Sequence, residues 1–65
     1  MKTHDLKTIK LTETARLYER TCLADGTIDY IACWMEQTRT MVKARTEVRK
    51  TLAAAERIFE KHANA

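Results

Sequence analysis

The stretch CLADGTIDYIACWME, residues 22–36, contains the only glycine of a 65-residue chain that has no proline. Glycine adopts positive φ at no steric cost, so Gly26 is the expected end of one helix and Thr27 the expected cap of the next. Isoleucines, a tyrosine, the single tryptophan and a methionine follow the turn at once. The stretch therefore predicts a tight turn between two helices, with an apolar surface beside it.

Upstream of this turn, apolar residues recur at helical spacing. Leu11, Ala15, Tyr18 and Cys22 follow one another at intervals of 4, 3 and 4 residues, which places them on one helical stripe. Thr12 is a suitable N-cap. The pattern predicts a short helix over residues 12–25.

Downstream of the turn, no glycine or proline occurs between residues 27 and 64, and strong helix formers fill the C-terminal third. This favours one long helix over residues 27–62. The short helix cannot cover its whole apolar side, which predicts self-association. With the upstream stripe, the expected core and dimer interface consists of Leu11, Ala15, Tyr18, Cys22, Met41, Ala44, Val48, Leu52, Ala55 and Phe59.

The expected fold is thus an all-α helical hairpin that assembles as a helical-bundle homodimer, with coiled-coil-like packing. The chain forms a single small domain, residues 1–65, in which residues 1–7 are a flexible N-terminal arm. One alternative is a three-helix bundle with a break near residues 38–40, where Thr38 and Thr40 are β-branched.

A second apolar stripe on the long segment is turned away from the first and calls for a second packing partner. With the neighbouring aromatic residues, it predicts a protein-binding surface, because aromatic residues and methionine are prominent in interfaces. The candidate partner-binding residues are Ile28, Tyr30, Ile31, Trp34, Met35 and Val42.

The chain is mildly basic, with 12 Lys and Arg against 9 Asp and Glu and a net charge of +3. On a helix, five of these cations share one stripe: Arg39, Lys43, Lys50, Arg57 and Lys61. Such a stripe is either a solvated face that keeps the protein soluble or a track for phosphates.

A second alternative starts from residues 8–12, whose polar and apolar side chains alternate as in a strand. A strand followed by a helix, a glycine turn and a threonine-capped helix is similar to the ribbon–helix–helix repressors. The resemblance covers about residues 7–35. It implies that Thr8, Lys10 and Thr12 contact bases, while the helix N-terminus at Thr27 holds a phosphate.

Groups for catalysis are sparse. The chain has no serine and no glycine-rich phosphate loop, its two histidines lie near opposite ends, and Cys22 and Cys33 lack CxxC spacing. We therefore expect no enzyme activity, no metal, no cofactor and no small-molecule substrate. No apolar run is long enough for a membrane span or an export signal, which predicts a cytoplasmic protein with reduced cysteines.

Together these patterns predict a small, non-catalytic, dimeric helical protein that binds another protein and modulates or inhibits it. Compact chains of this kind are common in phages and plasmids. The alternative function is a DNA-binding transcriptional regulator related to the ribbon–helix–helix proteins.

Overall fold

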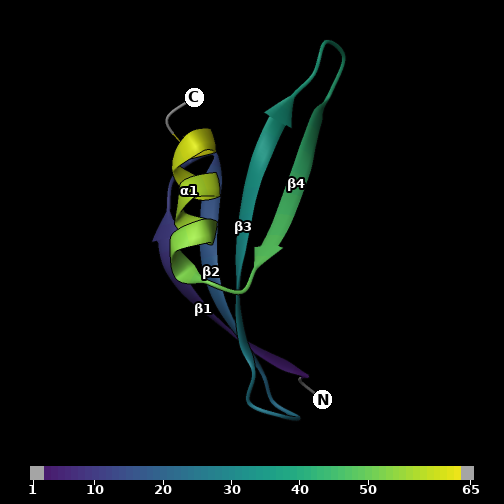
Figure 1. Cartoon of the computed structure of the whole chain (residues 1–65). Coiled ribbons are helices and arrows are strands. Elements are labelled where there is room, and N and C mark those ends of the chain that lie inside the picture. The colour runs from purple at the N-terminus through teal and green to yellow at the C-terminus, as the bar shows by residue number, and fades with distance from the viewer. Residues whose placement is uncertain (1–2, 64–65) are drawn as a thin grey trace.

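The structure is a computed structural model that describes residues 3–63. An antiparallel sheet dominates it, and a single helix packs on that sheet at the C-terminal end of the described chain (Figure 1). The elements in chain order are β1 (His4–Leu11), β2 (Ala15–Cys22), β3 (Ile28–Gln37), β4 (Val42–Arg49) and α1 (Leu52–Ala63).

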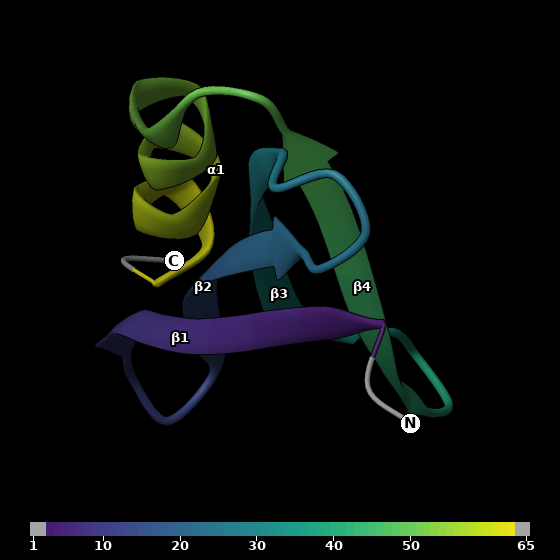
Figure 2. The ribbon, with the colours of Figure 1, turned by 90° about the horizontal axis from the view of Figure 1, so that it is seen from below.

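The four strands pair as a meander in the order β1-β2-β3-β4, and every pairing is antiparallel. The sheet is strongly twisted, so that β1 and β4 cross at a wide angle when the molecule is seen from below (Figure 2). The hairpin of β3 and β4 continues past the end of the helix (Figure 1).

Polar side chains close the turns between these strands. The Thr12 hydroxyl accepts a hydrogen bond from the Ala15 amide at 3.0 Å, and the Thr38 hydroxyl accepts one from the Met41 amide at 3.2 Å. Between β2 and β3, the Asp25 carboxylate accepts a hydrogen bond from the Thr27 amide at 2.9 Å. Threonine and aspartate thus supply the turns that the chain makes without proline.

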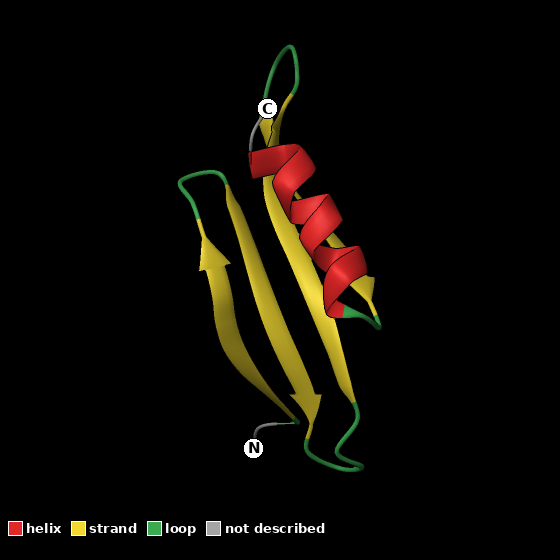
Figure 3. Ribbon diagram, turned by 60° about the vertical axis from the view of Figure 1, so that its left-hand side comes forward, coloured by secondary structure: helices red, strands yellow, loops and turns green. Residues whose placement is uncertain are grey.

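The helix covers one face of the sheet, chiefly over β3, and also contacts β2 and β4 (Figure 3). Thr51 precedes α1, and its hydroxyl accepts a hydrogen bond from the Ala54 amide at 3.4 Å. Within the described residues the buried core is small: Ala15, Leu17, Ala32, Ala55 and Phe59.

Two further contacts attach the helix to the sheet. Lys10 of β1 lies 3.9 Å from the Glu56 carboxylate and 3.7 Å from that of Glu60, and its Nζ lies 6.0 Å from the centre of the Phe59 ring. Beside the core, the Trp34 and His62 rings stack with their centres 3.9 Å apart.

The prediction of an all-α helical hairpin is wrong. Residues 12–25 form β2 and its flanking turns, and residues 27–62 form β3, β4 and α1. The segment from 28 to 49 is rich in β-branched and aromatic residues, which suit a pleated sheet with one covered face. A lack of glycine and proline was therefore compatible with strands, because threonine and aspartate form the turns.

The alternatives and the coiled-coil description fail for the same reason. Residues 38–41 form the turn between β3 and β4, where a three-helix bundle would have only a break. The expected strand 8–12 overlaps β1, but the next element is β2 and no helix–turn–helix follows, so the ribbon–helix–helix fold is also wrong.

The segment expected as a flexible arm, residues 1–7, overlaps β1, which begins at His4. Met1 and Lys2 lie outside the described residues.

Candidate functional site

The face of the sheet opposite the helix is the candidate functional site, and we call it the open face. Side chains alternate between the two faces of a strand, and directly paired residues share a face. Since Leu17 and Ala32 lie under the helix, their neighbours along β2 and β3 point the other way. The open face comprises His4, Leu6, Thr8, Leu11, Arg16, Tyr18, Arg20, Cys22, Asp29, Ile31, Cys33, Met35, Gln37, Val42, Ala44, Thr46 and Val48.

The centre of this surface is apolar. One row across the strands joins Tyr18, Ile31 and Val48, and the pair of Met35 and Ala44 follows after one intervening row of Arg16, Cys33 and Thr46. Met35 is exposed by 51% and Val48 by 41%. In the outer rows of the face, Leu6 is exposed by 59% and Val42 by 56%. Scattered single apolar residues are ordinary on protein surfaces, whereas a contiguous group on one face marks an interaction surface.

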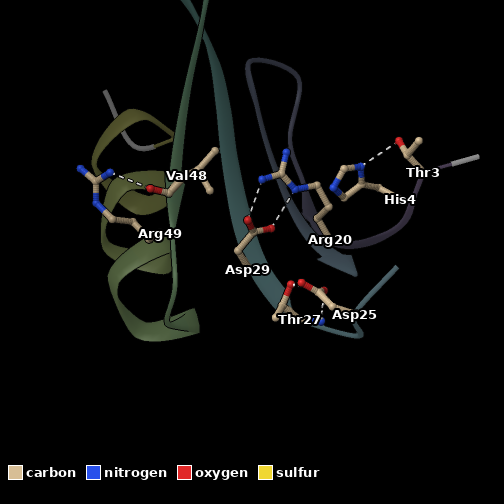
Figure 4. A network of polar contacts seen from close by, with 8 residues as sticks. All are labelled: Thr3, His4, Arg20, Asp25, Thr27, Asp29, Val48 and Arg49. Atoms are coloured by element: carbon tan, nitrogen blue, oxygen red, sulfur yellow. Dashed lines mark hydrogen bonds and ion pairs between the residues drawn. The ribbon is translucent and has the colours of Figure 1, made fainter. Parts of the chain in front are cut away.

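Two charged groups of the open face form an ion pair with each other. Arg20 of β2 binds Asp29 of β3 with two hydrogen bonds, from Nε to Oδ1 at 2.8 Å and from Nη2 to Oδ2 at 2.6 Å (Figure 4). The guanidinium lowers the pKa of the Asp29 carboxyl below its usual value, and the same hydrogen bonds raise the pKa of Arg20. Both side chains thus remain charged and paired near neutral pH.

Arg16 has a different partner on the same strand. Its Nη1 donates to the Tyr18 hydroxyl at 3.2 Å, and this hydrogen bond raises the pKa of the guanidinium. In the next row, the Thr46 hydroxyl donates to the Cys33 sulfur at 3.7 Å. Cys22 and Cys33 are both free thiols and half-buried. Arg16 and Thr46 therefore have hydrogen-bond partners within the face itself.

A cleft of 280 Å³ lies where the β1–β2 turn approaches β3 and β4. The Met35 amide donates to the Thr14 carbonyl at 2.9 Å beside it, which holds the turn against β3. The volume of the cleft is just under the range of about 300–1,000 Å³ that is usual for small-molecule sites. The lining residues are Glu13, Thr14, Ala15, Arg16, Cys33, Trp34, Met35 and Ala44.

The structure divides the six predicted partner-binding residues between the two faces. Ile31, Met35 and Val42 lie together on the open face. Tyr30 and Trp34 point to the helix side and pack on the core, while Ile28 lies near the start of β3 on that side and is exposed.

The predicted core and dimer residues are also divided. Ala15, Ala55 and Phe59 are buried under the helix. Leu11, Tyr18, Cys22, Ala44 and Val48 lie on the open face. Met41 is exposed in the β3–β4 turn, and Leu52 is exposed at the start of α1.

The basic residues expected on one stripe are dispersed over several elements. Arg39 lies in the β3–β4 turn, Lys43 in β4, Lys50 before the helix, and Arg57 and Lys61 on α1. The residues expected to read bases are separated too, because Thr8 is on the open face, Lys10 is paired with helix carboxylates and Thr12 is in a turn.

Sequence reasoning missed Leu17 and Ala32, the centre of the core, and the Arg20–Asp29 pair. A strand pattern that could have revealed them was present in β2. There, Arg16, Tyr18 and Arg20 alternate with Ala15 and Leu17 at the period of two that is typical of strands.

Among the described residues, no group of three or more His, Cys, Asp or Glu side chains could hold a metal ion. Nor does that part of the chain contain a helix with the length and apolar character needed to cross a bilayer. No protein-family model, curated protein or solved structure matches this chain.

Proposed function

We propose that this protein acts without catalysis, by binding another protein chain through the open face of its sheet and thereby modulating or inhibiting what it binds. The observation that carries the proposal is the apolar groups of that face: exposed Val48 lies beside half-buried Tyr18 and Ile31, and exposed Met35 lies one row beyond, past the row that contains Cys33. An apolar surface of this kind is stabilised when a partner removes it from water.

The polar groups of the face support the same function. Burying a charge is costly unless the charge is paired and hydrogen-bonded. Here Arg20 and Asp29 form a two-bonded pair, and Arg16 is hydrogen-bonded to Tyr18. A partner can therefore cover Arg20 and Asp29 without leaving either charge unpaired, whereas exposed Arg16 has only the neutral Tyr18 hydroxyl as its partner. The cleft beside Met35 can receive one large side chain, as the anchor pockets at the centres of interfaces do.

Nucleic acid is the second candidate, because three alternate residues along β2 lie on the open face: Arg16, Tyr18 and Arg20. Aromatic side chains flanked by cations bind single strands by stacking and by phosphate contact. Asp29 neutralises Arg20, and Tyr18 is the single aromatic ring among these three residues of β2. The protein partner is therefore favoured.

The test is affinity capture with matched baits. We expect Met35→Lys combined with Val48→Lys to abolish capture of the proteins that the wild-type chain binds, with affinity reduced at least about tenfold, because interface centres lose more than about 1.4 kcal/mol per key residue. Leu23→Lys is the control, since Leu23 is 53% exposed in the β2–β3 turn, away from the strands of the open face.

The proposal fails if the double variant captures the same proteins as the wild type. Capture that disappears after nuclease treatment of the extract, and also with Arg16→Ala, would instead identify a nucleic-acid-binding protein.

A further inference from the structure

We propose that the partner of the open face is a second copy of this chain, so that two sheets pack face to face with both α1 helices on the outside. This inference rests on the proposed function and names the protein that is bound. Four properties of the described chain support it: its accessible surface, its core, its sheet edges and the charge of the face.

The accessible surface is larger than the average for a folded monomer of this mass. The chain exposes 5169 Å² at 7.5 kDa. Folded monomers of that mass expose about 4,250 Å² on average, so the excess is about 900 Å². A standard protein–protein interface covers about 800 Å² on each partner. The surplus surface is therefore similar in size to the area that one protomer contributes to a standard interface.

The shape of the molecule accounts for this surplus. Its principal extents are 41 × 26 × 16 Å, which describes a thin slab of one sheet and one helix. Packed sheets lie about 10 Å apart, so a second sheet on the open face would thicken the slab into a block. Figure 3 shows the helix on one side of the sheet, and the other side has no covering element within residues 3–63.

The core of one copy is also small. Three of its five buried residues are alanines, and Leu17 is the largest side chain that is fully buried in the described chain. Small domains with such cores usually depend on disulfides, metals or association. The cysteines are free, and the described residues contain no cluster of metal ligands. Association is therefore the remaining means of adding buried apolar area.

The edges of the sheet are protected against strand pairing. β1 carries an irregularity in its register between Thr8 and Lys10, and β4 carries cationic Lys43, Arg45 and Arg49. Bulges and charged residues on edge strands are the usual means of preventing edge-to-edge association. A second copy is therefore expected on the face of the sheet and not along its edge.

The charge of the open face suits a copy of itself. Its cations Arg16 and Arg20 are balanced in part by Asp29, which leaves a formal charge of only +1 with His4 neutral. Two such faces can approach without strong repulsion. A strongly charged partner would find no complementary field there, and complementary fields are common in complexes between different proteins.

The experiment is a mass measurement by light scattering or sedimentation at about 10–100 µM, where an interface of standard size is largely occupied. We expect the wild-type chain to have twice its 7.5 kDa mass. Met35→Lys with Val48→Lys should return the mass to one copy. Both side chains are exposed in a single copy, so far-ultraviolet circular dichroism should remain unchanged. The control Leu23→Lys should remain dimeric.

Cysteine alkylation gives a second readout. In a Cys22→Ser background, Cys33 should react several-fold more slowly in the dimer than in the Met35→Lys, Val48→Lys monomer, because the partner sheet covers it.

Three outcomes are decisive. A dimer that dissociates through the double variant, with Cys33 protected, supports the inference. A wild-type monomer whose capture of a different protein is lost in the double variant overturns the inference but leaves the proposed function intact. A dimer unaffected by the double variant means that the copies meet at another surface, which also overturns the inference.

Discussion

At the scale of single residues, the chain changes direction through a few polar side chains and one glycine. Asp25 accepts hydrogen bonds from both the amide and the hydroxyl of Thr27, at 2.9 and 2.7 Å (Figure 4). These hydrogen bonds lower the pKa of the Asp25 carboxyl. Gly26, between them, has a φ of 75°, and its amide donates to the Cys22 carbonyl at 2.8 Å. This turn sets the register of β2 against β3.

We predict that Gly26→Ala lowers the free energy of unfolding by about 1–2 kcal/mol, the cost of a left-handed conformation for a residue with a Cβ. A Cβ at this position would meet no atom within 4 Å, so the loss comes from the backbone alone. Urea unfolding measures it. Gly26→Asn should lose less, because asparagine tolerates positive φ. Equal stability of Gly26→Ala and wild type would show that the turn does not need this conformation.

At the scale of elements, α1 is held to the sheet by few side chains. Phe59 and Ala55 are the buried residues of the helix, and Lys61 and His62 in its last turn suit the negative end of the helix dipole. His62 also stacks on Trp34 of β3. Phe59 is therefore the one large buried side chain of the helix, and half-buried Ile58 packs against the same core.

We predict that Phe59→Ala separates α1 from the sheet. Phenylalanine-to-alanine substitutions in cores cost about 3–5 kcal/mol, which is comparable to the whole stability of roughly 3–10 kcal/mol expected for 65 residues. Trp34 fluorescence reports the change, because the ring loses its contact with His62 and enters water. Phe59→Leu should retain most of the docked state. Arg57→Ala, exposed on the same helix, should change the stability by less than about 0.5 kcal/mol.

At the scale of the whole molecule, one sheet and one helix enclose too little apolar volume for a robust monomer. The open face gives the same sheet a second surface to bury, so folding and association should be linked. Stability then depends on protein concentration, which distinguishes an associating chain from a folded monomer.

We predict that the midpoint temperature of wild-type unfolding rises by roughly 5–10 °C for a hundredfold increase in protein concentration, as expected when the folded state is a dimer. The Met35→Lys, Val48→Lys variant should unfold at a lower temperature that does not vary with concentration. Calorimetry or thermal circular dichroism measures both. A wild-type midpoint independent of concentration would contradict linked folding and association.

Local patterns in the sequence were sufficient for some features of this protein. Gly26 is a turn with positive φ, and the run from Leu52 to Arg57 is helical, because both follow from the intrinsic preferences of the residues themselves. Of the four residues expected on one apolar stripe, Ile31, Met35 and Val42 share the open face, in strands and not in a helix, whereas Ile28 lies on the helix side.

Only the tertiary structure decided the rest. Apolar residues such as Leu11, Ala15 and Tyr18 fit a helical spacing, yet alternate residues of β2 fit a strand equally well, so short segments leave the period ambiguous. Pairing across the sheet resolves this ambiguity, since Leu17 is buried only when Ala32 and Phe59 lie against it. The Arg20–Asp29 pair likewise exists only once β2 and β3 are in register. Strands are stabilised by partners distant in sequence, and those partners are what local preference does not specify.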